Sequence, residues 1–244
     1  MKKNQFKFNL GVSIFGLAFM LMSSLLLSGC KEDISTEAYA TKTEPTLIDK
    51  IDEKSDELSS IRQLLDEVKL GNKSNSSSMT SVLSARGNYT VFAPNDEAVK
   101  QCVIELTGDE TGNIESLSYE QKQLIVLNCI IDNGDASAYE SVEFPTSNQT
   151  FALSNLNNRR LKCMQDAESH DYFINGDATS GSRVVETDYE CTNGMLHVVS
   201  KVILPSTKSV SELISIADNM HIFGKLLSET GLYDELALHR TDEI

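Results

Sequence analysis

The stretch NYTVFAPNDE, residues 88–97, decides the fold because it joins a short apolar strand to the start of a helix. Side chains alternate along this strand, with Tyr89, Val91 and Ala93 on one side and Thr90 and Phe92 on the other. This alternation predicts a strand that is covered on both faces. Pro94 is expected to end the strand. Asn95 can cap the helix that follows, and the next two residues are acidic, as favoured in a first helical turn. The corner is therefore interpreted as scaffold.

A second β-rich block lies about a hundred residues later. Asn193-Gly194 is a strong turn signal, and MLHVVSKVILP at residues 195–205 predicts a continuous, buried strand that Pro205 ends. We expect this strand to be central in a sheet. We also expect the two blocks to close on each other in one folded unit, so that Phe92 and Val198 share a core.

The segments around these blocks mix helical and strand patterns. Residues 47–70 carry the spacing of one or two amphipathic helices. Ser118 and Gln121 form a capping box before an apolar helix whose end is expected to turn into a buried strand. Residues 142–192 break into short apolar pieces separated by turn residues, which predicts short strands and hairpins. The fold class is therefore α+β.

The blocks YTVFAPNDEA (residues 89–98) and NGMLHVVSKVILP (residues 193–205) resemble the two signature blocks of the fasciclin domain. The resemblance covers residues 47–206. It implies a helical layer packed on a β wedge or sandwich, roles in adhesion and surface interaction, and neither a cofactor nor catalysis. One departure concerns the Tyr-His pair that family members often carry between the blocks. The matching positions here are Asn128 and Cys129, which weakens the transfer of the pair's adhesive role.

The N-terminus has the pattern of a bacterial lipoprotein signal peptide. Three lysines precede an apolar run at residues 10–27, and Leu27-Ser28-Gly29-Cys30 resembles a lipobox. We expect residues 1–29 to be removed, Cys30 to carry lipid and residues 30–46 to form an acidic tether. Because the apolar run is long enough to span a bilayer, an uncleaved transmembrane anchor is the alternative. Lys31-Glu32-Asp33 resembles the tag that sends lipoproteins of the Bacteroidetes to the outer face of the outer membrane.

Charge restricts the class of partner. Removing residues 1–29 takes away three lysines and no acid, so the formal charge changes from −15 to −18. Such a surface repels nucleic acid and anionic headgroups. The expected partners are the membrane, through lipid on Cys30, and an unidentified protein or glycan at the cell surface.

No assembled reactive site is predicted. His197 falls where the fasciclin block also has histidine, and a hydrogen-bonded structural role is expected for it. His170, His221 and His239 are too dispersed to form a metal triad. No catalytic, cofactor or metal residue is assigned. Four cysteines follow Cys30: Cys102, Cys129, Cys163 and Cys191. They can either form disulfides or remain buried free thiols.

The C-terminal residues 207–244 are predicted to be a linker and the start of a second, incomplete fasciclin-like domain. At an offset of 162 residues, the apolar or acidic class of side chain is kept between two segments: Leu58, Ile61, Leu64, Leu65, Glu67 and Leu70 match Met220, Phe223, Leu226, Leu227, Glu229 and Leu232. The alternative is that two amphipathic helices share this pattern by chance.

The leading functional hypothesis is a lipid-anchored surface protein that acts in adhesion or in protein or glycan binding without catalysis. The alternative is an accessory or hydrolytic component of a surface polysaccharide-acquisition system, which would use carboxylates in the loops at residues 132–182. A third possibility is a spacer that holds another domain away from the membrane.

Overall fold

The computed structural model describes residues 44–71, 76–205 and 209–237, in two parts: 44–205 and 209–237. The predicted leader, Cys30 and most of the tether lie outside these residues. The larger part contains the helices α2 (Leu47–Glu53), α3 (Ser55–Glu67), α4 (Met79–Ser84), α5 (Asp96–Thr107) and α6 (Tyr119–Asn128). Its strands are β1 (Tyr89–Pro94), β2 (Ile130–Asp132), β3 (Gln149–Thr150), β4 (Lys162–Gln165), β5 (Tyr172–Ile174), β6 (Ser182–Cys191) and β7 (Gly194–Val199). The expected α+β class is confirmed.

The two sequence blocks lie side by side in one sheet. Its seven strands run in the order β2-β1-β7-β6-β5-β4-β3. β1 and β7 pair in parallel from Tyr89 opposite Gly194 to Pro94 opposite Val199, whereas the other neighbours pair antiparallel. Residues 192–193 form the turn between β6 and β7, as Asn193-Gly194 predicted.

β7 is internal to the sheet, as expected, but the prediction that it runs to Pro205 is wrong. The strand ends at Val199, opposite Pro94. Its partner β1 stops there because the chain turns at Asn95 into α5, so the ladder cannot continue. The Ser200 backbone N–H still donates to the Arg183 carbonyl of β6 at 2.9 Å. The chain then leaves the sheet, although Val202 and Ile203 remain buried.

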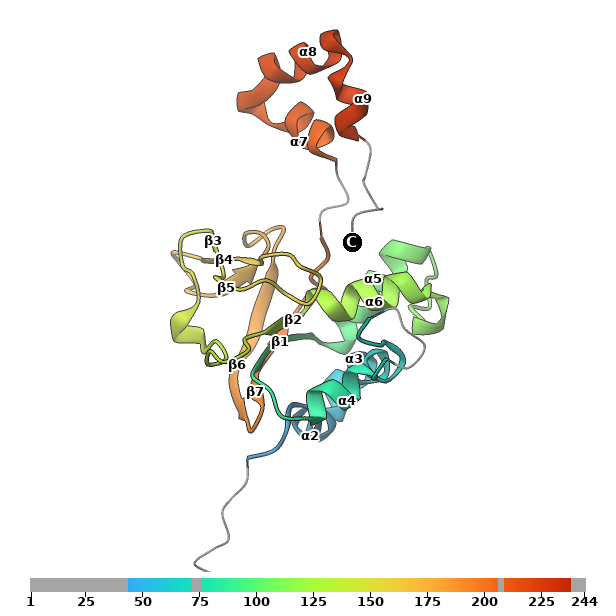
Figure 1. Cartoon of the computed structure of the whole chain (residues 1–244), viewed down its shortest axis with the longest axis vertical. Coiled ribbons are helices and arrows are strands. Elements are labelled where there is room, and N and C mark those ends of the chain that lie inside the picture. The colour runs from blue at the N-terminus through green and yellow to red at the C-terminus, as the bar shows by residue number, and fades with distance from the viewer. Residues whose placement is uncertain (1–43, 72–75, 206–208, 238–244) are drawn as a thin grey trace, which may run out of the picture. The chain divides into compact units, whose positions relative to one another are not determined.

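The pair β1/β7 separates two apolar clusters. Helices pack on one face, around Val91 and Val198. The other face, which carries Phe92, is covered by residues of β4, β5 and the segment 144–161. Figure 1 shows the helices gathered on one side of β1 and β7, with β3, β4 and β5 on the other side. The sheet therefore curls around the second cluster.

The expectation that Phe92 and Val198 share a core is wrong in this detail. Val198 is the cross-strand partner of Ala93, and Phe92 is opposite His197. Since successive side chains of a strand point to opposite faces, Phe92 and Val198 lie on different sides of the same strand pair. The two blocks still close on each other, as predicted.

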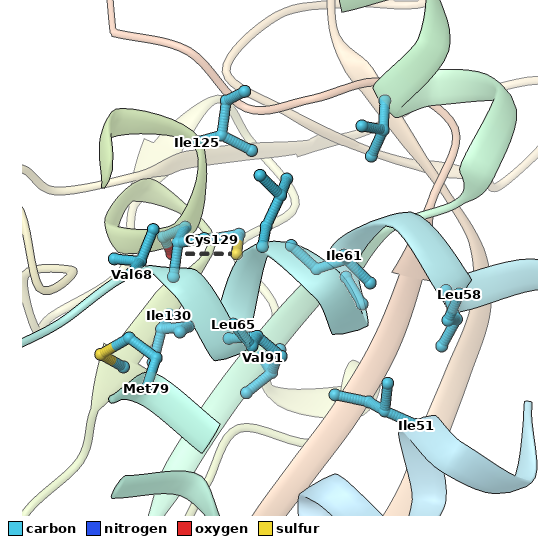
Figure 2. Packing of buried hydrophobic residues seen from close by; sticks show 14 of the residues in the cluster. Ile51, Leu58, Ile61, Leu65, Val68, Met79, Val91, Ile125, Cys129 and Ile130 are labelled. Carbon is cyan, nitrogen blue, oxygen red and sulfur yellow. Dashed lines mark hydrogen bonds between the residues drawn. The ribbon is translucent and has the colours of Figure 1, made fainter. Parts of the chain in front are cut away.

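The helical layer is fixed to the sheet by α3. Leu58, Ile61, Leu64 and Leu65 are all at most 1% exposed. Figure 2 shows Leu65 close to Val91 of β1, with Ile61 about one turn earlier in the same helix. Each fully buried aliphatic side chain contributes about 1.5–3 kcal/mol. The amphipathic spacing of residues 47–70 thus positions the whole layer.

Side-chain caps set the helix starts that the sequence predicted. The Asn95 side chain accepts from the Ala98 backbone N–H at 2.9 Å and begins α5. Ser118 and Gln121 form the expected reciprocal capping box at the start of α6. α6 ends at Asn128, and the buried strand β2 begins two residues later. Among the described residues, no helix is both long and apolar enough to cross a bilayer.

Candidate functional site

The most polar point of the core is His197, in the middle of β7. Its side chain is 0% exposed and stacks on Phe92 with the ring centroids 5.3 Å apart. The Asp188 backbone N–H donates to Nδ1 at 3.2 Å, so Nε2 carries the proton and donates to the Tyr139 carbonyl at 3.0 Å. Burial lowers the pKa of His197 to about 4. The ring is therefore neutral near pH 7, and the expected structural role is confirmed.

Asp188 shapes the backbone beside this histidine. It has a φ of 63° within an irregular stretch of β6. Its carboxylate accepts from the Ser141 backbone N–H at 2.7 Å and also from the Ser141 hydroxyl. Burial alone would raise the pKa of Asp188, but the hydrogen bonds from Ser141, together with smaller contributions from Thr187 and His197, lower the net pKa. The carboxylate is ionised and holds the loop at residues 140–143.

A second set of buried bonds ties this loop to β1. The Tyr139 backbone N–H donates to the Thr90 hydroxyl at 2.8 Å, and that hydroxyl donates to the Asn133 side chain at 3.0 Å. Thr90 and Asn133 are both buried. With His197 and Asp188 they link β1, β6, β7 and the loop after β2. Sequence reasoning missed the buried polar residues Thr90 and Asn133 and the exposed Asp188, because their partners are distant along the chain.

Two of the loop carboxylates that a hydrolase could use accept hydrogen bonds within their own turns. Asp166 accepts from the backbone N–H groups of Glu168 and Ser169, and Asp177 accepts from those of Thr179 and Ser180. The backbone bonds lower the pKa of Asp166. The hydroxyls of Thr179 and Ser180, followed by their backbone N–H groups, lower the pKa of Asp177. A general acid needs the opposite change, a raised pKa. The turns explain these residues as local structure.

The positions of the family's Tyr-His pair are closed to solvent. Asn128 and Cys129 are each 1% exposed, at the end of α6. The Asn155 side chain donates to the Asn128 carbonyl and to its side-chain oxygen, both at 3.1 Å. These residues join α6 to the loop after residue 153. They cannot present an adhesive side chain at the surface.

A shallow hollow lies beside these positions. Its apolar part comes from the outer face of α6 and from two loops, and its rim is polar: Leu70, Leu124, Leu127 and Leu156, with Glu120, Gln123, Asn157 and Asn158. Leu70 is 41% exposed. Besides the leucines, the hollow is lined by Gly71, three amide side chains and one carboxylate.

The four described cysteines are buried free thiols, which decides between the two alternatives left open. Cys163 belongs to the cluster around Phe92, whereas Cys191 belongs to the cluster under the helices. Burial raises the pKa of both thiols, to about 12 for Cys163 and about 11 for Cys191. A thiol of such high pKa is a poor nucleophile at neutral pH.

The remaining histidines do not form a site with one another. His170 lies in the loop between β4 and β5, His221 begins α8 (His221–Thr230), and His239 lies outside the described residues. In the part of the chain that the structure describes, no three side chains of the metal-binding types gather closely enough to hold an ion.

Comparison with known proteins identifies the domain. The chain is 25% identical over 154 residues to the transforming growth factor-beta-induced protein ig-h3 of Oryctolagus cuniculus, and also to that of Sus scrofa. Each alignment covers 60% of this chain but only 19% of the relative. The chain thus spans about a fifth of these curated relatives.

Among solved structures, a FAS1 domain pair from the insect cell adhesion molecule fasciclin I aligns with a TM-score of 0.37 and 16% identity. The alignment covers 62% of this chain and 48% of that one. The fasciclin domain family model matches residues 56–205, which is more than half of the 244 residues and includes both sequence blocks. The chain therefore belongs to the fasciclin domain family, with a mixed α+β fold of helices and a curled seven-stranded sheet.

Proposed function

We propose that this protein is a lipid-anchored cell-surface protein whose fasciclin domain binds a protein or glycan partner in adhesion, without catalysis. The match of residues 56–205 to the fasciclin domain family carries the proposal, because this family is associated with adhesion-type binding proteins. The ligand and its binding face are left open.

The chemistry of the core supports a binding role. His197 is neutral, buried and bonded on both ring nitrogens, and Asp188 is occupied by Ser141. The Ser141 hydroxyl faces Asp188 instead of the histidine, so these three residues do not line up as nucleophile, base and orienting acid. Their bonds hold strands and loops together. Asp166 and Asp177 in the loops at residues 132–182 do not support the hydrolytic alternative, because their pKa is lowered.

Anchoring is proposed from the sequence of the leader. Cleavage before Cys30 would leave a cysteine that carries acyl chains, and each buried methylene adds about 0.8 kcal/mol to membrane binding. Lys31-Glu32-Asp33 supports export to the outer face of the outer membrane. The acidic segment that follows, up to residue 46, would then separate the domain from the membrane.

Adhesion of intact cells tests both parts of the proposal. A deletion strain is complemented with the wild type, with Cys30→Ser, or with a lipidated chain lacking residues 47–206. Attachment is measured on a panel of glycans and matrix proteins. We expect attachment to be restored by the wild type alone, because one variant lacks the anchor and the other lacks the domain. Attachment that is unchanged by the deletion across the panel would contradict an adhesive role.

Purified protein separates binding from hydrolysis. Soluble protein from residue 31 onward is incubated with polysaccharides and peptides, and products are measured beside Asp177→Asn. We expect no turnover by either protein. A rate that Asp177→Asn abolishes would favour the hydrolytic alternative instead.

A further inference from the structure

Residues 209–237 form short helices whose apolar side chains are mostly exposed. The helices are α7 (Val210–Ile216), α8 (His221–Thr230) and α9 (Leu232–Ala237), and they pack on one another. Nine large apolar residues of this part are at least 38% exposed: Val210, Leu213, Ile216, Met220, Ile222, Phe223, Leu226, Leu232 and Leu236. The much longer part at residues 44–205 exposes only four, Leu70, Tyr119, Val142 and Val185. Such a dense apolar surface indicates a face that is built to be covered.

The backbone of this part repeats the start of the fasciclin domain. α2 and α7 each have seven residues and begin at a reciprocal capping box, made by Thr46 with Asp49 and by Ser209 with Glu212. The two caps are 163 residues apart, one more than the offset of the side-chain pattern. In both cases a residue with non-helical dihedral angles follows this helix: Leu58 lies inside α3, and Met220 directly precedes α8. The kink residue Leu58 has φ −118° and ψ 19°, and Met220 has φ −114° and ψ 10°.

Leu58 and Met220 are also 162 residues apart, which is the offset at which the side-chain pattern repeats. A chance amphipathic helix would reproduce the apolar spacing. It would not also reproduce the capping box, the length of the first helix and the dihedral angles of the kink. The repeat is therefore one of structure as well as sequence.

Three of the matched pairs differ strongly in how far their side chains are covered. Leu58, Ile61 and Leu64 are 0% exposed because α3 lies on β1. Their counterparts Met220, Phe223 and Leu226 are 44%, 51% and 51% exposed. Leu227, the counterpart of Leu65, is already buried at 4%. The exposed stripe is thus the face that, in the first domain, rests on the sheet.

We propose that residues 209–237 are the helical half of a second fasciclin unit, and that the exposed stripe of α8 docks on the apolar sheet face of that unit. The surface that covers the stripe is an aliphatic sheet face. It resembles the face of β1 and β7 that carries Val91 and Val198 in the first domain. Glu229 matches Glu67, which pairs with the buried Lys122 of α6 at 2.6 Å. We therefore expect a cation at the matching position of the second unit.

A helix graft tests the fit, with the first domain's own sheet as the probe. In soluble protein from residue 31 to 244, residues 56–70 are replaced by residues 218–232, which puts Met220, Phe223, Leu226 and Leu227 at the buried positions of α3. The matched control inserts residues 220–234 instead. That shift of two residues puts Lys225, Ser228 and Glu229 at positions 61, 64 and 65.

Urea unfolding followed by circular dichroism distinguishes the two registers. We expect the in-register graft to unfold cooperatively, at a lower urea midpoint than the wild type, because Gly224 enters a helix interior and Thr230 replaces the buried Val68. The shifted graft should show no cooperative transition. An in-register graft that is no more stable than the shifted one overturns the proposal.

The unaltered chain provides a second measurement that does not depend on the graft. In size-exclusion chromatography with light scattering, residues 31–244 should be monomeric. They should also bind more 1-anilinonaphthalene-8-sulfonate than residues 31–206, since the apolar stripe of α8 is exposed. A dimer that forms through residues 209–237 would show that a second copy covers the stripe and would contradict the proposal. Neither result depends on the adhesive function.

Discussion

A single added methyl group, in the variant Gly194→Ala, tests most sharply whether the two blocks pair. Gly194 stands opposite Tyr89 at the start of the parallel β1/β7 pair, with a φ of 152°. A Cβ on Gly194 would lie 2.0 Å from the Tyr89 carbonyl oxygen and 2.8 Å from its nitrogen. Because both atoms belong to the backbone, the strands would have to separate in Gly194→Ala.

The expected cost combines three contributions. Overpacking of a close contact costs about 1–3 kcal/mol. Loss of the hydrogen bond from the Tyr89 N–H to the Asn193 carbonyl, 3.1 Å long, costs about 1 kcal/mol. A positive φ costs a non-glycine residue about 1 kcal/mol more. We expect Gly194→Ala to lower the free energy of unfolding by about 4 kcal/mol.

Gly108→Ala is the matched control. Gly108 has a φ of 73° at the end of α5, and a Cβ there would meet no atom within 4 Å. This variant keeps the conformational cost without the clash, so a loss of about 1 kcal/mol is expected. Urea unfolding of residues 31–244 at pH 7 measures both. If the two variants agree within about 0.5 kcal/mol, β1 and β7 do not approach as described.

Three further predictions concern charge and chemistry in the core. The pKa of His197 falls from 6.5 to about 4 on folding, so its contribution to stability is complete above pH 6.5 and is lost as the pH falls toward 4. The free energy of unfolding, measured at a series of pH values, should therefore decrease by about 3 kcal/mol over this range. The decrease should be smaller in His197→Gln. Lys122→Ala should lower the free energy of unfolding by about 2 kcal/mol, because Glu67 loses its partner at 2.6 Å. Lys225→Ala, at an exposed pair with Glu229, should lower it by less than about 0.5 kcal/mol. Equal losses in the two variants would argue against a stabilising pair between Lys122 and Glu67. In protein from residue 31, a thiol reagent should label no cysteine rapidly in the native state and four after unfolding, and labelling of only two would reveal a disulfide.

Local chemistry made much of the fold predictable. The alternation at residues 89–93 defines β1, and Asn95 and Ser118 begin helices because their side chains satisfy backbone N–H groups within three residues. Asn193-Gly194 marks the turn before β7. Each of these signals depends on neighbours along the chain, so no knowledge of tertiary contacts was needed.

The errors and omissions all depend on distant partners. β7 ends at Val199 because β1 ends opposite it, which no pattern in residues 195–205 reveals. Phe92 faces away from Val198 because the register of β1 against β7 pairs Phe92 with His197. The same limit applies to Asp188, whose partner Ser141 is 47 residues away. The sequence left open whether Cys163 and Cys191 form a disulfide, because strand patterns do not show which apolar cluster each side chain enters.

The contacts of the Phe92 ring test most directly whether the two blocks form one internal brace. In the nuclear Overhauser spectrum of residues 31–244, the paired blocks predict cross-peaks from this ring to His197, Phe144 and Phe151, whose ring centroids lie 5.3, 5.6 and 5.7 Å away. No cross-peak to the Val198 methyl groups is expected, because they lie on the other face. Cross-peaks from Phe92 to Val198, or none to His197, would contradict the parallel pairing of β1 with β7.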